Sequence, residues 1–114
     1  MKNFVSYIAL LPLLIACGQG APERDRMYRI QHVSAACVSR EAYDAYVEAA
    51  VWASETRDAS RMVAVYASGI CVRMQPNELV RVKSPGVLVS EICYPATPCT
   101  TTLYTANERL VNPI

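Results

Sequence analysis

The sequence predicts an α+β fold in which a helical hairpin is followed by a small β-barrel of four to five short antiparallel strands. Apolar side chains recur at helical spacing after Ser39, whereas short segments of alternating apolar and polar residues follow Gly69. Several short strands that are separated by tight turns are typical of a small barrel. We therefore expect one globular domain over residues 32–114.

Two helices are expected, over about residues 39–54 and 58–68. Ser39 is a favourable N-cap because its side-chain oxygen can accept a hydrogen bond from the first helical turn. Gly69 follows the second helix at the position where glycine commonly ends a helix. Four apolar residues of the first helix share one face, which we expect to point into the core: Tyr43, Val47, Ala50 and Val51.

A break between the helices is expected near Thr56–Asp58, where polar residues that favour helix ends are concentrated. One straight helix from Cys37 to Cys71 would separate their Cα atoms by about 50 Å, whereas a disulfide needs Cα atoms within about 7 Å. A bond between these two cysteines would therefore require the chain to turn back. Asp58 is placed to cap the second helix.

The expected strands lie within about residues 70–112 and are joined by tight turns. Segments 70–74, 79–83, 87–94 and 100–105 are rich in residues that favour strands. Residues 106–111 are expected to form a short turn or a last strand. Pro76 and the Pro85-Gly86 pair mark two of the turns.

Residues 70–111 resemble bacterial SH3-like domains. The resemblance is carried by the strand that opens after Gly69, by Val80-Arg81-Val82 after a tight turn, and by the terminal segment Leu103-Tyr104-Thr105-Ala106-Asn107-Glu108. It implies that the predicted barrel is an SH3-like barrel. Many bacterial SH3-like sequences carry a tryptophan where this chain has Tyr104, so the chain departs from the family pattern at the terminal strand.

The start of the chain resembles a bacterial lipoprotein signal peptide. Lys2 precedes an apolar run from Phe4 to Ile15, and Leu14-Ile15-Ala16-Cys17 is similar to the lipobox of that family. The run is shorter than the roughly 20 apolar residues that span a bilayer, as in a cleaved signal. The resemblance implies that residues 1–16 are removed. It also implies that Cys17 carries a diacylglyceryl thioether and an N-acyl group, which together give stable anchoring.

Residues 17–31 are then expected to form a lipidated N-terminus and a flexible tether. Gly18 occupies the position that influences sorting, and because it is not Asp the resemblance favours the outer membrane, with the protein facing the periplasm. The alternative is an ordinary secretory signal that is cut after Gly20 or Ala21. That cleavage would discard Cys17.

The chain has five cysteines, and assigning Cys17 to lipid leaves an even number of them. Four cysteines can form two disulfides in three alternative connectivities, and disulfides are typical of exported proteins. The spacings are long compared with the short pairs of zinc sites, so no metal site is expected. The four candidates for disulfide bonding are Cys37, Cys71, Cys93 and Cys99.

Charge and residue content argue against several function classes. The formal net charge is +1, and removal of Lys2 with the signal leaves equal numbers of cationic and anionic side chains. Nucleic-acid binding would need a basic patch, which this balance does not supply. The single histidine, His32, lies beside the expected tether, where it is poorly placed for a Ser-His-Asp or Cys-His arrangement. We expect neither an enzymatic activity nor a cofactor.

The expected function is that of a non-enzymatic binding module of the bacterial envelope, held at the membrane by its lipid. Tyr94 and Tyr104 offer apolar area together with a hydroxyl group, and Arg73 and Arg81 could add a polar rim. These four residues are the candidate surface for an envelope protein or a cell-wall glycan. The alternative function is an inhibitor, immunity or exclusion lipoprotein of a prophage or mobile element.

Overall fold

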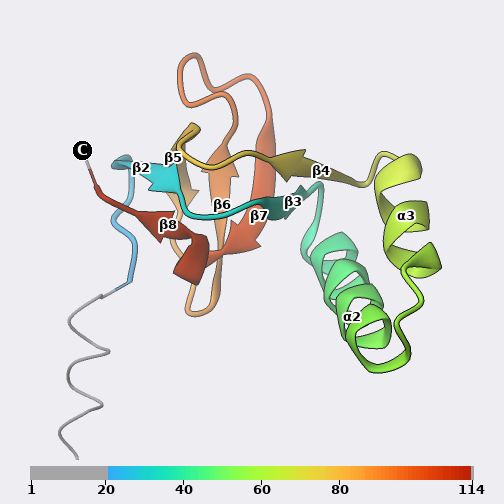
Figure 1. Ribbon diagram of the computed structural model, residues 1–114. Coiled ribbons are helices and arrows are strands. Elements are labelled where there is room, and N and C mark those ends of the chain that lie inside the picture. Colours follow the sequence, from blue (N-terminus) through green and yellow to red (C-terminus); the bar gives the residue numbers. More distant parts are fainter. Residues whose placement is uncertain (1–20, 114) are drawn as a thin grey trace, which may run out of the picture.

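The computed structural model describes residues 21–113, which form a seven-stranded antiparallel sheet and two main helices (Figure 1). The predicted lipidation site, Cys17, lies outside the described residues. The strands lie in the order β4-β3-β7-β6-β5-β2-β8. In chain order the elements are β2 (Met27–Ile30), β3 (Ser34–Cys37), α2 (Arg40–Thr56), α3 (Ser60–Ala67), β4 (Cys71–Met74), β5 (Leu79–Ser84), β6 (Val89–Cys93), β7 (Thr102–Ala106), the 3₁₀ helix η1 (Asn107–Arg109) and β8 (Leu110–Val111).

The expectation of an N-terminal helical hairpin followed by an SH3-like barrel is wrong. Two strands, β2 and β3, precede the helices, and both lie inside the sheet. β3 lies between β4 and β7, and β2 lies between β5 and β8. The segment 70–111 therefore supplies β4 to β8, but only β5, β6 and β7 pair with one another directly. Its strands depend on β2 and β3 for the rest of their pairing, so they do not close into a barrel of their own.

The chain also joins the sheet earlier than expected for a tether over residues 17–31. The backbone N–H of Asp25 donates to the carbonyl of Val82 at 2.7 Å, and the N–H of Val82 donates to the carbonyl of Arg26 at 3.0 Å. β2 then pairs with β5 on one side and with β8 on the other. The last part of the expected tether is therefore a strand inside the sheet, between β5 and β8.

The main core lies on one face of the sheet, and the sheet curls around it. Strands β4 and β2 stand five positions apart in the sheet, which corresponds to about 24 Å in a flat sheet. Met74 of β4 and Ile30 of β2 nevertheless belong to the same buried cluster, so the sheet must be strongly curved. The main core consists of Tyr28, Ile30, Ala36, Met74, Val80, Val82, Ile92 and Leu103.

The two helices form an arm, residues 40–67, that is inserted between the paired strands β3 and β4 (Figure 1). The side chain of Ser39 accepts a hydrogen bond from the N–H of Ala42 at 3.0 Å and so caps α2. Arg57 adopts a left-handed conformation at the end of α2, and a carboxylate oxygen of Asp58 accepts from the N–H of Ser60 at the start of α3. The chain therefore turns back where the sequence pattern places the break.

A second, smaller core joins the base of the arm to the sheet. It contains Ala35 and Cys37 of β3, Cys71 of β4 and Ala42 of α2. Because successive residues of a strand face opposite sides, β3 contributes Ala36 to the main core and its two neighbours to the second core. All four residues of β3 are buried, which explains why a short strand of small side chains can lie inside the sheet.

Two disulfides are present, and both lie at places where the chain leaves the sheet and returns. Cys37 and Cys71 are directly paired across β3 and β4, so their bond closes the base of the arm. Cys93 and Cys99 close the loop that joins β6 to β7. We call residues 93–99 the disulfide loop.

Candidate interaction surface

The four residues of the expected binding surface do not form one patch. Arg73, Arg81 and Tyr104 alternate with main-core residues along β4, β5 and β7, so they lie on the outer face of the sheet. β4 and β5 are not paired with each other, because β3, β7 and β6 lie between them in the sheet. Tyr94 packs against the main core instead. Each of these side chains therefore has its own surroundings.

Tyr94 has a structural role at the end of β6. Its hydroxyl lies 2.8 Å and 2.9 Å from the two carboxylate oxygens of Glu78 and donates a hydrogen bond to them. Burial of the ring, together with this carboxylate, raises the pKa of Tyr94 to about 12. The hydroxyl is thus already occupied by an internal partner.

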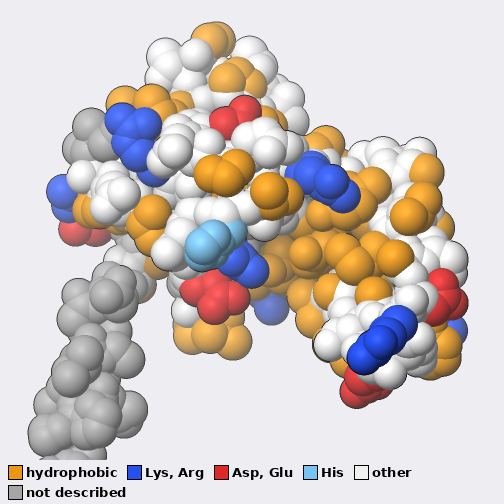
Figure 2. Space-filling model, in the orientation of Figure 1, with side chains coloured by type: hydrophobic (Ala, Val, Ile, Leu, Met, Phe, Trp, Pro, Cys, Tyr) orange, Lys and Arg blue, Asp and Glu red, His pale blue; other side chains and the backbone are white. Residues whose placement is uncertain are grey.

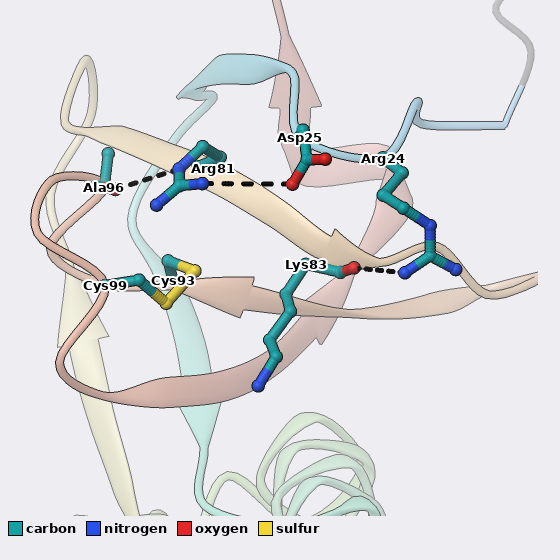
Figure 3. A network of polar contacts seen from close by, with 7 residues as sticks. All are labelled: Arg24, Asp25, Arg81, Lys83, Cys93, Ala96 and Cys99. Atoms are coloured by element: carbon teal, nitrogen blue, oxygen red, sulfur yellow. Dashed lines mark hydrogen bonds and ion pairs between the residues drawn. A yellow bond between two sulfur atoms is a disulfide. The ribbon is translucent and has the colours of Figure 1, made fainter.

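Arg81 holds two segments that cross the outer face near the middle of β5 (Figure 3). Its Nε donates to the carbonyl of Ala96 in the disulfide loop at 3.1 Å. Its Nη1 lies 3.8 Å from a carboxylate oxygen of Asp25, which is largely exposed. Through these contacts, Arg81 fastens the disulfide loop beside the start of the described chain.

Arg73 belongs to the base of the arm. Its guanidinium lies 5.0 Å from the centre of the Tyr66 ring of α3, within the range of a cation–π contact. Tyr66 in turn packs edge-on against Tyr46 of α2, with ring centres 6.1 Å apart. Burial raises the pKa of Tyr66 above its usual range. Arg73 therefore links the edge strand β4 to the aromatic rings that pack between the two helices.

Most apolar side chains of the arm are only half-buried, and three of its valines are exposed. Within α2 only Ala42 and Ala49 are buried, and α3 has no buried residue. Val47, Val51 and Val63 are 40%, 49% and 64% exposed. Tyr43 of the expected stripe packs against the second core, but the expectation that Val47 and Val51 face the core is wrong, because the face with the small alanines turns inward.

Two shallow grooves run along the arm. The α3 groove has a volume of about 470 Å³, and the α2 groove has a volume of about 380 Å³. Figure 2 shows hydrophobic side chains gathered where the arm meets the sheet. The α3 groove is lined by Ala59, Met62, Val63, Tyr66, Ala67 and Arg73. The α2 groove is lined by Val47, Glu48, Val51, Trp52, Glu55 and Arg61.

The two helices hold each other in a defined arrangement although little of their surface is buried. The guanidinium of Arg61 on α3 lies 3.9 Å from the centre of the Trp52 ring on α2. At the base, Tyr43 and Tyr46 have ring centres 5.8 Å apart, and burial raises the pKa of Tyr43. The arm is thus tied together near its tip and at its base, and it presents Val51 and Val63 between these ties.

A larger hollow of about 670 Å³ lies where the two ends of the described chain come together. His32, at a position of positive φ between β2 and β3, is one of its lining residues. Glu23 and Arg26 also line it and form an exposed ion pair at 3.1 Å. His32, Glu23 and Arg26 are not arranged as a nucleophile with its base. We place the candidate surface on the arm because exposed valines lie there.

Residues 21–113 contain no group of three or more His, Cys, Asp or Glu side chains that could hold a metal ion. No helix in the same part of the chain is long and apolar enough to cross a bilayer. Comparison of the sequence with protein-family models and with curated proteins, and of the structure with solved structures, found no match.

Sequence reasoning missed the exposed valines of the arm as candidates for binding. The signal available in the sequence was the second apolar face of α2, since alanines at 42 and 49 also recur at helical spacing. A helix with two apolar faces can bury only one of them against a single sheet. The other face, with Val47 and Val51, is then left exposed.

Proposed function

We propose that this protein is a lipid-anchored component of the bacterial envelope that binds a partner protein through the arm, without catalysing a reaction. The lipobox-like segment that ends at Cys17 supports the anchor. Two disulfides favour an oxidising compartment, as expected for a protein that faces the periplasm. Gly18 favours the outer membrane over the inner membrane.

The observation that carries the binding proposal is the exposure of Val47, Val51 and Val63 on an inserted arm. Val47 and Val51 line the α2 groove, and Val63 lines the α3 groove. Exposed apolar surface that is gathered in this way commonly marks a place of contact. The grooves beside these valines are bordered by charged side chains, including Arg61 and Glu55. An apolar centre with a charged rim is the usual anatomy of a protein–protein interface.

The construction of the arm also suits binding. A disulfide closes its base, and the Arg61–Trp52 contact holds the helices together beyond it. A surface that is already ordered loses little conformational entropy on association. The arm can therefore present its valines to a partner without first having to fold against it.

Site-specific photo-crosslinking in the native host tests this proposal. A photoreactive phenylalanine analogue at position 51 or 63 is expected to give a discrete adduct with one envelope protein. The same analogue at position 97, in the exposed part of the disulfide loop, serves as the matched control and is expected to give none. Val51→Asp is expected to reduce the adduct from position 63 about tenfold, since it places a charge in the apolar centre.

Two outcomes would contradict the proposal. In chains that are folded and correctly oxidised, positions 51 and 63 could give no adduct, or they could give the same adducts as position 97. Either outcome would show that the arm is not a binding surface. Circular dichroism and non-reducing electrophoresis of each variant establish that the chain is folded and oxidised.

A further inference from the structure

The first contacts of the chain with the sheet limit how far the folded domain can stand from the proposed anchor. Pro22 is already buried, and the guanidinium of Arg24 donates to the carbonyl of Lys83 at 2.8 Å (Figure 3). Only five peptide units separate Cys17 from Pro22, and they reach at most about 18 Å in any conformation. A lipid on Cys17 would therefore bring the part of the domain around Arg24 close to the bilayer.

The tip of the β5–β6 hairpin, residues 84–88, begins directly beside this point. Lys83, which accepts the hydrogen bond from Arg24, leads into the tip. In Figure 1 the tip lies at the lower end of the sheet and the disulfide loop lies at the upper end. The described chain begins toward the lower end and runs along β5, where Arg24 contacts Lys83 before Asp25 contacts Arg81. The part of the sheet that faces an anchor on Cys17 is therefore the one that carries the tip.

The tip carries the most exposed large hydrophobic side chains of the described chain. Val87 is 91% exposed and Leu88 is 74% exposed. Neither side chain is needed for the main core or for the second core. Leu88 also lines a groove of about 360 Å³ at the base of α2, together with Tyr43 and Val47, but most of its side chain stays exposed. Val87 is almost fully exposed, so both side chains can enter an apolar medium without disturbing the fold.

The backbone of the tip is prepared for such a medium. The side-chain amide of Asn107 donates to the carbonyls of Gly86 and Val87, each at 2.9 Å, and the backbone N–H of Asn107 donates to the carbonyl of Leu88 at 2.8 Å. The N–H of Gly86 donates to the hydroxyl of Ser90 at 3.0 Å. These polar groups therefore need no water, which removes a large part of the penalty for bringing backbone into lipid.

Close packing also fixes the shape of the tip. A Cβ atom at position 86 would overlap the carbonyl oxygen of Val89, so this turn requires glycine. The exposed side chains of Arg24 and Lys83 lie on the domain side of the tip. Cations at that level are suited to anionic lipid headgroups while Val87 and Leu88 reach beyond them.

We propose that Val87 and Leu88 insert into the headgroup–acyl boundary of the leaflet that carries the acylated Cys17. This inference rests on the proposed lipid anchor. The tip then acts as a second, shallow contact with the membrane, and the two contacts together set the orientation of the domain. The base of the arm lies beside the tip, where Tyr43 and Val47 share a groove with Leu88, so the orientation of the domain also fixes how the arm is presented to a partner.

The test uses the acylated full-length mature chain in vesicles of equimolar phosphatidylethanolamine and phosphatidylglycerol. Val87→Trp in a Trp52→Phe background reports on the tip, and Thr97→Trp in the same background is the matched control in the disulfide loop. Lipids brominated on their acyl chains are expected to quench the Val87→Trp chain about fivefold more strongly than the Thr97→Trp chain, because interfacial insertion reaches about 5–10 Å into the boundary.

The mass of the N-terminal peptide in the same preparation separates the two proposals. An acylated chain in which both tryptophan positions are quenched equally weakly would overturn the insertion and leave the anchor intact. A mature chain without acyl groups would overturn the anchor, and the insertion with it. Acrylamide quenching of the tryptophan at position 87 gives a third readout. If added host protein, and not lipid, protects this tryptophan from acrylamide, the tip binds a protein partner and the insertion is overturned.

Discussion

The hydroxyl of Tyr94 connects the end of β6 to Glu78, which immediately precedes β5. Glu78 also accepts a hydrogen bond from the N–H of Gln75 at 2.7 Å, so its carboxylate closes the turn between β4 and β5 as well. The Tyr94 hydroxyl and the Gln75 N–H thus have an internal partner, the Glu78 carboxylate, in place of water. A tyrosine that the sequence suggested for binding therefore helps to hold the fold together.

Replacing Tyr94 by Phe is expected to lower the free energy of unfolding by about 2 kcal/mol at neutral pH, the usual size of a lost hydrogen bond to a charged group. The pKa of Tyr94 is raised to about 12 in the folded chain, from an ordinary value near 10. The stabilising contribution is therefore complete below about pH 10 and is lost as the pH rises through about 12.

We therefore expect the free energy of unfolding to fall less steeply with pH in Tyr94→Phe than in the parent chain between pH 9 and 12. The difference in slope should correspond to about one proton. Denaturant unfolding at a series of pH values measures it. Tyr104→Phe is the control, because no hydrogen bond of that hydroxyl is found within residues 21–113. Identical alkaline slopes for Tyr94→Phe and the parent chain would show that the Glu78 contact does not hold the proton.

The arm is the element on which the proposed binding depends, and its helices are stabilised more by their ends and by each other than by burial. α2 begins with a side-chain cap at Ser39, and α3 begins with the Asp58 carboxylate on the N–H of Ser60. This hydrogen bond holds the pKa of Asp58 below its usual range. Helices with so few buried residues depend strongly on such local contacts.

Ser39→Ala is expected to cost about 1 kcal/mol, because the N–H of Ala42 loses its acceptor. Hydrogen exchange should speed up first in the opening turn of α2. Ser54→Ala, on an exposed position of the same helix, should leave both the unfolding free energy and the exchange pattern nearly unchanged. Equal effects of the two substitutions would argue against a capping role for Ser39.

The whole molecule combines a curved sheet with two chain segments that leave the sheet and are closed by disulfides. The two segments differ greatly in length. The Cys37–Cys71 bond spans 34 residues and contains the entire arm, whereas the Cys93–Cys99 bond spans 6 residues. In the chain-entropy account a disulfide stabilises by restricting the unfolded chain, and the effect grows with the length of the closed loop. The two bonds should therefore contribute unequally.

Replacing Cys37 and Cys71 together by Ala is expected to lower the free energy of unfolding by about 4 kcal/mol, compared with about 2 kcal/mol for Cys93 and Cys99. Both double variants keep an even number of cysteines after Cys17, so mispairing does not complicate the comparison. Thermal and denaturant unfolding measure the difference. A larger loss for the shorter loop would show that native contacts of the disulfide loop, and not loop closure, dominate.

Local features of this protein were predictable from its sequence. Helical spacing, the cap at Ser39 and the polar residues around Asp58 all act within a few residues, so the pattern placed two helices and the turn between them. The period-two segments after Gly69 likewise indicated short strands. Proximity of Cys37 and Cys71 also followed, once the chain was expected to turn back.

Tertiary structure decided which segments pair and which faces are buried. β2 and β3 are four-residue strands that carry little pattern of their own, and they are held by partners far along the chain, at β5, β7 and β8. Once β3 is buried on both faces, α2 can bury only its alanine side, and Val47 and Val51 stay exposed. Pairing over such distances depends on the global balance of buried surface and chain entropy, which local spacing does not record.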